Sequence, residues 1–278
     1  MIRSAVRKAI EKVGYDITRR PLDDTADRYK DFPQESLINR RFYNIGAGEF
    51  HHPYWTNVDL ANKWYQQVQK QPFLNYDLMA LSPLPIASGT AELFYCCHVI
   101  EHISDEAVTN LCKEAYRCLK PGGVIRFLTP DAELEYNAYR RGDRDFFHWV
   151  HEIEHVANAS LQRVFLNHFA TQICEYDGQG PGTLKPVPDS EVARIFATLP
   201  MEQAFDHFTK QCTFDPDYAG NHINWWTDKK LGKILRDAGF AMVYRSGHGQ
   251  SLSSALRDLR YFDATHYIRI SLYMEAIK

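Results

Sequence analysis

The sequence predicts an α/β fold built on a doubly wound, mostly parallel sheet. Three observations support this class. Short apolar segments typical of buried strands alternate with helical or loop segments, a glycine-rich turn directly follows the first strand, and the connections are short. The chain has 278 residues, which suits one domain with an insert. We expect this domain over residues 41–278, with an inserted cap at about 131–224 and an N-terminal extension over 1–40.

Composition narrows the functional classes. Hydrophobic residues make up 45% of the chain, charged residues 24%, and the formal net charge is −3. These values are ordinary for a globular protein and exclude an intrinsically disordered chain. A slightly acidic chain also lacks the basic footprint of a phosphate-gripping protein, so no nucleic-acid partner is expected. The six cysteines form no C-x-x-C pair, and we expect reduced, buried thiols.

Residues 1–20 predict a short amphipathic helix with one apolar face and basic residues around the other. Its apolar face consists of Ile2, Val6, Ile10 and Val13. Such a helix can pack on its own protein, on a partner protein, or on an anionic membrane surface. No apolar run typical of a secretory signal follows the basic residues. We therefore expect a cytoplasmic protein, with peripheral contact at the inner face of the membrane as one option. Residues 16–40 are polar and are expected to be irregular.

The first half of the predicted sheet follows. Residues 41–45 are a buried strand that runs into the glycine turn, and 56–60 form a second short strand that ends near Asp59. Residues 63–71 are a helix candidate, and 73–78 are an extended segment.

The next segments have a stronger pattern. Residues 91–97 are continuously apolar, which is typical of a strand covered on both faces. Residues 104–119 have helical periodicity, and the helix ends at the Pro and Gly of 120–123. Residues 124–128 are the next strand.

From residue 131 to about 224 the alternation of strands and helices is lost, and this stretch is interpreted as the cap. Its many aromatic side chains suit either stacking on sugar rings or packing in a core. Alternation returns with a helix over 227–238, followed by strands over 240–245 and 267–276. The last two strands suggest an antiparallel end of the sheet.

The glycine turn, Gly46-Ala47-Gly48, indicates a ligand that approaches the backbone closely. A dinucleotide site would need a third glycine and an acidic residue about 20 positions later. Here the third glycine is missing, and Asp59 follows Gly46 too soon. The segment between them is too short for the helix that holds a pyrophosphate. A cofactor without phosphates, such as S-adenosylmethionine, needs only the close approach and a carboxylate for its ribose.

Several motifs occur together in a fixed order: FYNIGAGEFHHPYWTNVD at 42–59, HVIEH at 98–102, LKPGG at 119–123, LGKILRDAGF at 231–240 and SLYMEAIK at 271–278. With this set the sequence resembles the class I S-adenosylmethionine-dependent methyltransferases. More narrowly, it is similar to a bacterial subgroup associated with surface-polysaccharide biosynthesis. The resemblance covers about half of the chain.

The resemblance implies a Rossmann-like fold with S-adenosylmethionine as cofactor. Carried over by position, the glycines line the methionine and ribose side, Asp59 binds the ribose hydroxyls, and Asp77 flanks the adenine. The cofactor-binding residues expected in this way are Gly46, Ala47, Gly48, Asp59, Leu60, Asp77 and Leu78.

The candidate catalytic residues are His98, Glu101 and His102, in an H-x-x-E-H pattern after the strand at 91–97. A hydroxyl acceptor must lose its proton during methyl transfer, and His98 is placed to act as the general base. Two other roles stay open. His98 can brace the cofactor pocket, or it can join Glu101 and His102 in a cluster that binds a metal ion. The sequence alone assigns no metal.

A second histidine group, His148, His151 and His155, lies in the cap. Its spacing fits a solvated helix face better than an acceptor surface or a metal site.

The resemblance implies O-methylation of a glycan or sugar intermediate. One alternative is a methyltransferase for another small-molecule acceptor. Another is a non-catalytic binding protein of the same fold in a glycan-assembly complex, with residues 1–20 as its docking helix.

Overall fold

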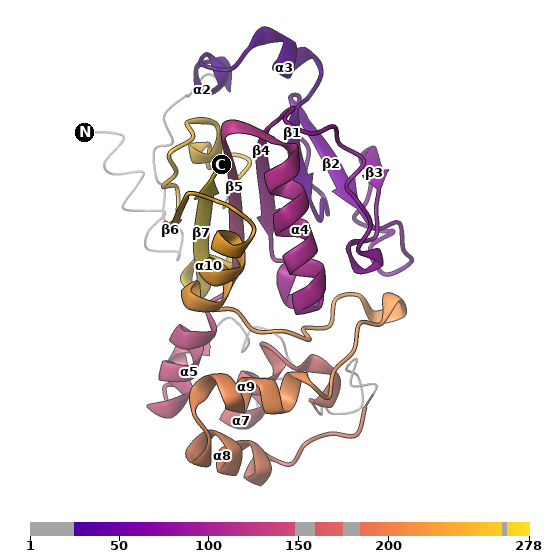
Figure 1. Cartoon of the computed structure of the whole chain (residues 1–278). Coiled ribbons are helices and arrows are strands. Elements are labelled where there is room, and N and C mark those ends of the chain that lie inside the picture. The colour runs from indigo at the N-terminus through magenta and orange to yellow at the C-terminus, as the bar shows by residue number, and fades with distance from the viewer. Residues whose placement is uncertain (1–24, 148–158, 175–183, 263–265) are drawn as a thin grey trace, which may run out of the picture.

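One sheet organises the molecule, with its strands in the order β3-β2-β1-β4-β5-β7-β6 (Figure 1). The computed structural model describes residues 25–147, 159–174, 184–262 and 266–278. The helix expected within residues 1–20 lies outside these ranges. The strands are β1 (Phe42–Ile45), β2 (Trp55–Asp59), β3 (Phe73–Asn75), β4 (Ala91–Cys97), β5 (Leu119–Pro130), β6 (Met242–Arg245) and β7 (Ser271–Ile277).

Strand direction confirms the predicted fold class. β1 pairs in parallel with β2 and β4, and β4 pairs in parallel with β5. β7 is antiparallel to both β5 and β6, as the sequence suggested. β3 also pairs in parallel with β2. Because the five parallel strands β1 to β5 end on the same side, the loops after them meet at one edge of the sheet.

The central strands are apolar throughout because both faces of the sheet are covered. In β4, Phe94 and Cys96 pack with α4 (Asp105–Cys118) in one core, while Leu93 and Tyr95 belong to a second core on the opposite face. α4 begins where the sequence predicted, because the Ser104 hydroxyl caps it by accepting from the Ala107 amide at 3.2 Å.

The second core is mostly aromatic. Tyr29, Phe42, Trp55 and Phe262 are all at most 4% exposed, and they pack edge to face or tilted against one another. Tyr29 comes from α2 (Thr25–Tyr29), which with α3 (Gln34–Ile38) replaces part of the segment expected to be irregular. Pro33 is the N-cap of α3, where its missing backbone amide costs no hydrogen bond within the helix.

Several expectations about the elements were wrong. The strands expected over 240–245 and 267–276 begin only at Met242 and Ser271, and residues 266–269 form a 3-10 helix ahead of β7. Residues 63–68 form turns, and 69–71 continue without regular structure, where a helix was expected. The third strand is shorter than expected, because Asp77 caps the short 3-10 helix η1 (Leu78–Ala80). β5 begins already at Leu119, which pairs with Ala91 ahead of a register shift.

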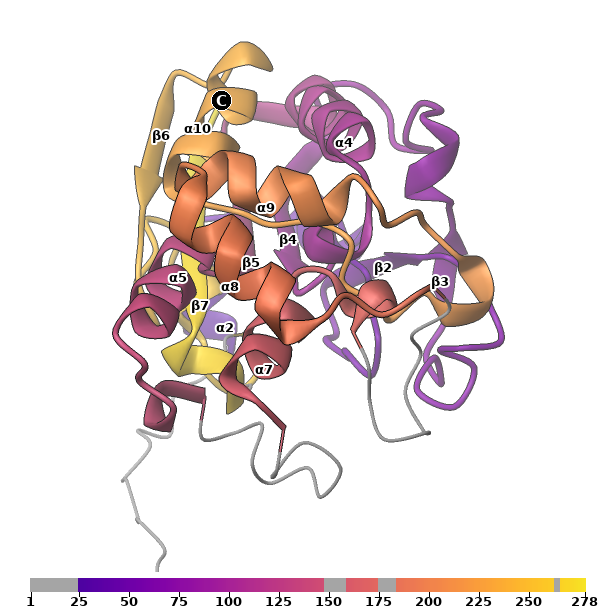
Figure 2. The same cartoon turned by 90° about the horizontal axis from the view of Figure 1, so that it is seen from below.

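Among the described residues, the segment between β5 and α10 (Asp228–Asp237) consists of helices joined by turns and irregular stretches, with no strand. These helices lie beyond the carboxyl ends of the parallel strands (Figures 1 and 2). Its α-helices are α5 (Ala132–Arg140), α7 (Leu161–Asn167), α8 (Asp189–Thr198) and α9 (Met201–Thr209), and its 3-10 helices are η3 (Asp145–Phe147), η5 (Thr171–Ile173) and η6 (Pro216–Tyr218).

This segment has a hydrophobic core of its own, and its aromatic side chains fill that core. Phe165, Phe196 and Phe205 are at most 1% exposed, and Trp225 is 5% exposed. Of the two uses that the sequence left open for the aromatic residues, core packing therefore explains these four.

The antiparallel end of the sheet is held by a buried ion pair. Arg126 of β5 and Glu275 of β7 are both 0% exposed and their side chains lie 2.5 Å apart. Arg126 also donates to the carbonyl oxygens of Gly247 and Gln250 in the loop after β6. These additional bonds satisfy the donors of a guanidinium that has no access to water. The loop is completed by η7 (Ala255–Arg257) and η8 (His266–Arg269).

All six cysteines are free thiols, as expected from their spacing. Cys97 and Cys212 are partly exposed, and the other four are buried. Among the described helices, none combines the length and the apolar character that crossing a bilayer requires.

Candidate functional site

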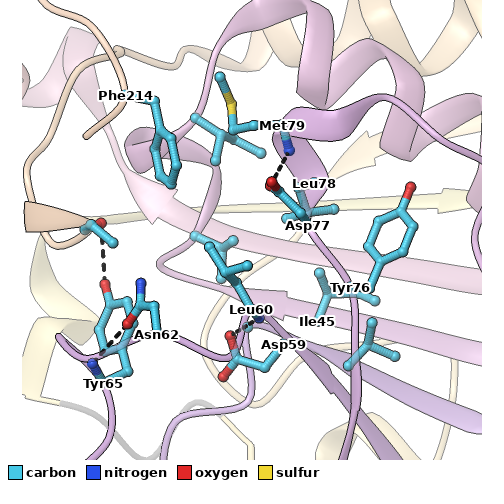
Figure 3. Close-up of a pocket in the computed structure, with 15 residues that line it drawn as sticks. Ile45, Asp59, Leu60, Asn62, Tyr65, Tyr76, Asp77, Leu78, Met79 and Phe214 are labelled. Carbon is cyan, nitrogen blue, oxygen red and sulfur yellow. Dashed lines mark hydrogen bonds between the residues drawn. The ribbon is translucent and has the colours of Figure 1, made fainter. Parts of the chain in front are cut away.

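A cavity opens at the carboxyl edge of the sheet, where β1, β2 and β3 end (Figure 3). Five of the seven residues predicted to bind the cofactor line it. They are Gly46, Asp59, Leu60, Asp77 and Leu78. In Figure 3, Leu60 lies between Asp59, the last residue of β2, and Asp77, which precedes the 3-10 helix η1. This is the edge at which doubly wound sheets bind their ligands.

The carboxylate of Asp59 holds the glycine turn together. One oxygen accepts from the backbone amides of Ala47 at 3.1 Å and Gly48 at 3.3 Å, and the other accepts from Leu60 at 2.8 Å. A carboxylate offers about four acceptor positions. Three are used by the protein itself, and one remains for a ligand.

Two features require a glycine at position 46, namely the backbone conformation and the adjacent side chain of Val99. The φ of Gly46 is +69°, and a Cβ built on this residue would lie 2.2 Å from Cγ2 of Val99. Gly48 also has a positive φ, +51°, but a Cβ there would meet nothing within 4 Å.

The glycine turn separates two cavities. Gly46 borders both, while Ala47 and Gly48 line only the second, with Arg260 and Tyr261 on its far side. The structure therefore brings all three turn residues to a cavity wall, although not to the same one.

Asp77 uses one carboxylate oxygen to cap η1, accepting from the Met79 amide at 2.8 Å. This bond fixes the turn that presents Leu78 and Met79 to the first cavity.

The sequence did not identify several residues of the first cavity. Phe214 and Ala219 come from the helical segment between β5 and α10, and Tyr65 comes from the stretch wrongly expected to be helical. Tyr65 donates to the Ala219 carbonyl at 3.3 Å. Burial, with the charges of Glu101 and Asp59, raises the pKa of Tyr65 well above its ordinary value, so the hydroxyl keeps its proton. Phe214 lies far along the chain from the motifs, so no feature of the sequence indicated that it lines this cavity.

The candidate catalytic residues lie together in the segment after β4. His98 has a φ of +51°, which is unusual for a residue with a side chain. Its Nδ1 lies 2.9 Å from Glu101 Oε1, and its Nε2 lies 2.9 Å from Ser271 Oγ of β7. Val99 and Ile103 of this segment line the first cavity.

Glu101 is a buried carboxylate surrounded by histidines. It is 1% exposed, and Thr129 Oγ1 donates to its Oε2 at 3.2 Å. Burial alone would raise the pKa of Glu101. The charges of His98, His102 and His222, with the His98 hydrogen bond, outweigh burial and lower the pKa to about 2. The group is therefore ionised at neutral pH.

His222 joins this cluster from the helical segment. Its ring lies 4.7 Å from that of His102, measured between centroids, at an angle of 70°. Burial, and next the neighbouring His102, lowers the pKa of His222 to about 3. The sequence expected a cluster of His98, Glu101 and His102. The structure adds His222 to it, and His148, His151 and His155 lie outside the described residues.

Comparisons with known proteins agree with this geometry. Residues 46–127, which include the glycine turn, Asp59, Asp77 and the HVIEH segment, match a family described as a methyltransferase domain. The cofactor of that domain is S-adenosylmethionine. No curated protein sequence matches the chain.

Among solved structures, the chain is similar to three methyltransferases at low sequence identity. A possible histamine N-methyltransferase from Thermotoga maritima is 12% identical, with 91% of this chain and 98% of that chain covered and a TM-score of 0.39. A methyltransferase from Mesorhizobium loti is 14% identical, with 88% and 96% covered and a TM-score of 0.41. SibL is 12% identical, with 85% of this chain covered and a TM-score of 0.38; the chain spans 50% of its length.

Proposed function

We propose that the chain is an S-adenosylmethionine-dependent O-methyltransferase that acts on a hydroxyl of a glycan or sugar intermediate. The observation that carries the cofactor part is the cavity bounded by Gly46, Asp59 and Asp77 within the matched methyltransferase segment. The hydroxyl acceptor is supported by the environment of His98.

The adenosine part of the cofactor fits between the two carboxylates. The remaining acceptor position of Asp59 would take a ribose hydroxyl, since its three other positions are used by backbone amides. The second oxygen of Asp77 would accept from the adenine amino group. Hydrogen bonds to charged groups contribute about 1.5–3 kcal/mol each. The methionine end would then pass Gly46 toward Gly48.

His98 is arranged as a base. An ionised carboxylate only accepts, so Nδ1 of His98 must carry the proton that points to Glu101. In the neutral ring Nε2 then has a free lone pair, which accepts from the Ser271 hydroxyl. An acceptor hydroxyl that replaces Ser271 at this nitrogen could give its proton to Nε2 while its oxygen takes the methyl group. The sulfonium leaves as neutral S-adenosylhomocysteine, and the acceptor becomes a methyl ether.

The glycan acceptor rests on the resemblance to the polysaccharide-associated subgroup alone. The buried aromatic residues of the helical segment give it no support, since they are not available for stacking on a sugar. The two alternatives are methylation of another small-molecule acceptor and a binding protein without turnover.

The test compares turnover and cofactor affinity in His98→Asn. Asparagine tolerates the positive φ at this position and cannot act as the base. We expect kcat for S-adenosylhomocysteine release to fall about 10²–10⁴-fold, with hydroxylated sugars as acceptors. Calorimetry should show nearly unchanged S-adenosylmethionine affinity. The exposed His248→Asn is the matched control and should turn over like the parent.

Each alternative has its own result. Loss of cofactor affinity in His98→Asn with an unchanged kcat would show that His98 braces the pocket. Turnover with small molecules but not with sugars would exclude the glycan acceptor. Tight cofactor binding without turnover on any acceptor class would favour the binding protein.

A further inference from the structure

We propose that Glu101, His102 and His222 form a binding site for a divalent transition-metal ion. One ligand atom of each residue lies within 4.8 Å of the others. Ligands of a tetrahedral ion at 2.0–2.1 Å are about 3.4 Å apart, so small side-chain rotations would close the site. This proposal does not depend on methyl transfer.

The two histidines are held in the form that binds metals. Nδ1 of His102 lies 3.0 Å from the carbonyl oxygen of Asn221, and Nδ1 of His222 lies 2.6 Å from that of His168. A carbonyl only accepts, so each Nδ1 carries the proton. Nε2 of each neutral ring therefore keeps its lone pair. A metal-binding histidine typically donates its other nitrogen to a carbonyl or carboxylate in this way.

The third ligand is also fixed in place. Glu101 accepts from His98 through Oε1 and from Thr129 through Oε2, which orients the carboxylate. Each oxygen has a further lone pair that a cation can use. In this arrangement His98 positions the ligand Glu101 and is not itself a ligand.

Backbone hydrogen bonds hold the segment that contains His222 in place, next to the segment that contains Glu101 and His102. The amides of Ile223 and Asn224 donate to the Glu101 carbonyl at 2.9 and 3.1 Å. The amide of His222 donates to Thr171 Oγ1 at 3.1 Å, and the Thr171 amide donates to the His222 carbonyl at 2.9 Å. The ligands are therefore preorganised although they are distant in the sequence.

The two imidazoles and one carboxylate determine which class of metal ion the site would prefer. This set suits Zn²⁺, Fe²⁺ and related transition-metal ions, whereas Mg²⁺ and Ca²⁺ prefer oxygen ligands throughout. Three protein ligands leave at least one position open. Because Val99 and Ile103, which flank Glu101 and His102 in the sequence, line the first cavity, the open position would lie close to it.

The experiment measures metal binding on tag-free, chelator-treated protein. We expect the parent to bind one Zn²⁺ by calorimetry and one Co²⁺ with visible absorption bands. Mg²⁺ in excess should not displace either ion. His102→Gln, His222→Gln and Glu101→Gln should each weaken Zn²⁺ binding by about 100-fold or more. The matched control His248→Gln, which changes an exposed histidine, should bind like the parent.

These measurements can either support or overturn the proposed metal site. Circular dichroism shows which variants fold, and the three ligand variants are independent of one another. Because the parent measurement needs no variant, the absence of stoichiometric Zn²⁺ and Co²⁺ binding would overturn the proposal. It would also be overturned if folded His222→Gln bound as tightly as the parent, or if His248→Gln lost binding equally. None of these results depends on cofactor binding or turnover.

Discussion

At the scale of single residues, Asp59 shows how a side chain predicted to bind a ligand also stabilises the fold. The resemblance predicted only its contact with the ribose. The structure shows that most of its acceptor capacity stabilises the glycine turn. A substitution there is expected to disturb the turn itself, in addition to the predicted contact with the ribose.

His52 is a second residue whose environment sets its chemistry. It is 3% exposed in the aromatic core. Its Nδ1 accepts from the Tyr54 amide at 3.1 Å, and its Nε2 lies 3.1 Å from the Tyr29 hydroxyl. A backbone amide only donates, so Nδ1 cannot carry a proton without breaking this bond. Burial lowers the pKa of His52 to about 4, despite the opposing charge of Asp258.

We predict that His52 makes the protein less stable in mild acid. Unfolding returns the pKa of His52 from about 4 to about 6.5, so the unfolded state binds the proton first as the pH falls. Proton binding to His52 therefore leaves the free energy of unfolding unchanged above pH 6.5, and lowers it progressively as the pH falls to about 4. Between pH 7.5 and 5 this amounts to about 2 kcal/mol. Urea unfolding of the parent and of His52→Gln at both pH values measures it.

In His52→Gln the amide oxygen can still accept from the Tyr54 amide, but nothing titrates. The loss of stability between the two pH values should therefore be about 2 kcal/mol smaller than in the parent. His248→Gln should keep the parent's loss. An equal loss in parent and His52→Gln would contradict the prediction.

At the scale of elements, the turn between β1 and β2 depends on a contact with the segment after β4. The sequence explained Gly46 through the space that a ligand needs. The structure adds the side chain of Val99, which occupies the position next to the missing Cβ. The turn and the HVIEH segment are therefore packed against each other before any ligand binds.

We predict that Gly46→Ala lowers the free energy of unfolding by about 2–5 kcal/mol, through overpacking and the positive φ. It should also remove S-adenosylmethionine binding. Adding Val99→Ala removes the clash and should restore part of both. Thermal unfolding and calorimetry measure the two effects.

Gly48→Ala is the matched control, because it has the same unfavourable φ but open space around the Cβ. It should cost only about 1–2 kcal/mol. The explanation through Val99 would be wrong if Gly46→Ala and Gly48→Ala were equally destabilised, or if Val99→Ala gave no rescue.

At the scale of the whole molecule, the first cavity is lined, among the described residues, by side chains and backbone from Ile45 to Ala219. Tyr29 of α2 belongs to the aromatic core on the other face of the sheet. We predict that deletion of residues 1–20 leaves S-adenosylmethionine affinity unchanged. Calorimetry on the truncated protein measures this affinity.

The same truncation tests the proposed contact of residues 1–20 with a membrane or a partner. Co-sedimentation with vesicles rich in anionic lipid should fall on deletion, because the segment predicted to form a basic amphipathic helix is removed. Vesicles of neutral lipid are the control. Weaker cofactor binding in the truncated protein would instead place this segment over the cavity.

The sequence by itself determined the fold class, and it predicted the glycine turn that borders the first cavity. Continuous apolar strands such as β4 and the capped, periodic helix α4 are strong local signals, and the order of the motifs located Asp59 and Asp77. Local chemistry was sufficient here because parallel strands must end at one edge, whichever helices cover them.

Only the tertiary structure decided what completes the site. Phe214 reaches the first cavity, and His222 reaches the cluster around Glu101, from the stretch interpreted from the sequence as a cap. Tyr65 reaches the cavity from turns. The place of His222 beside Glu101 is set by backbone hydrogen bonds between segments distant in the chain. Such contacts leave no periodicity or spacing in the sequence, because they depend on where the whole insert docks.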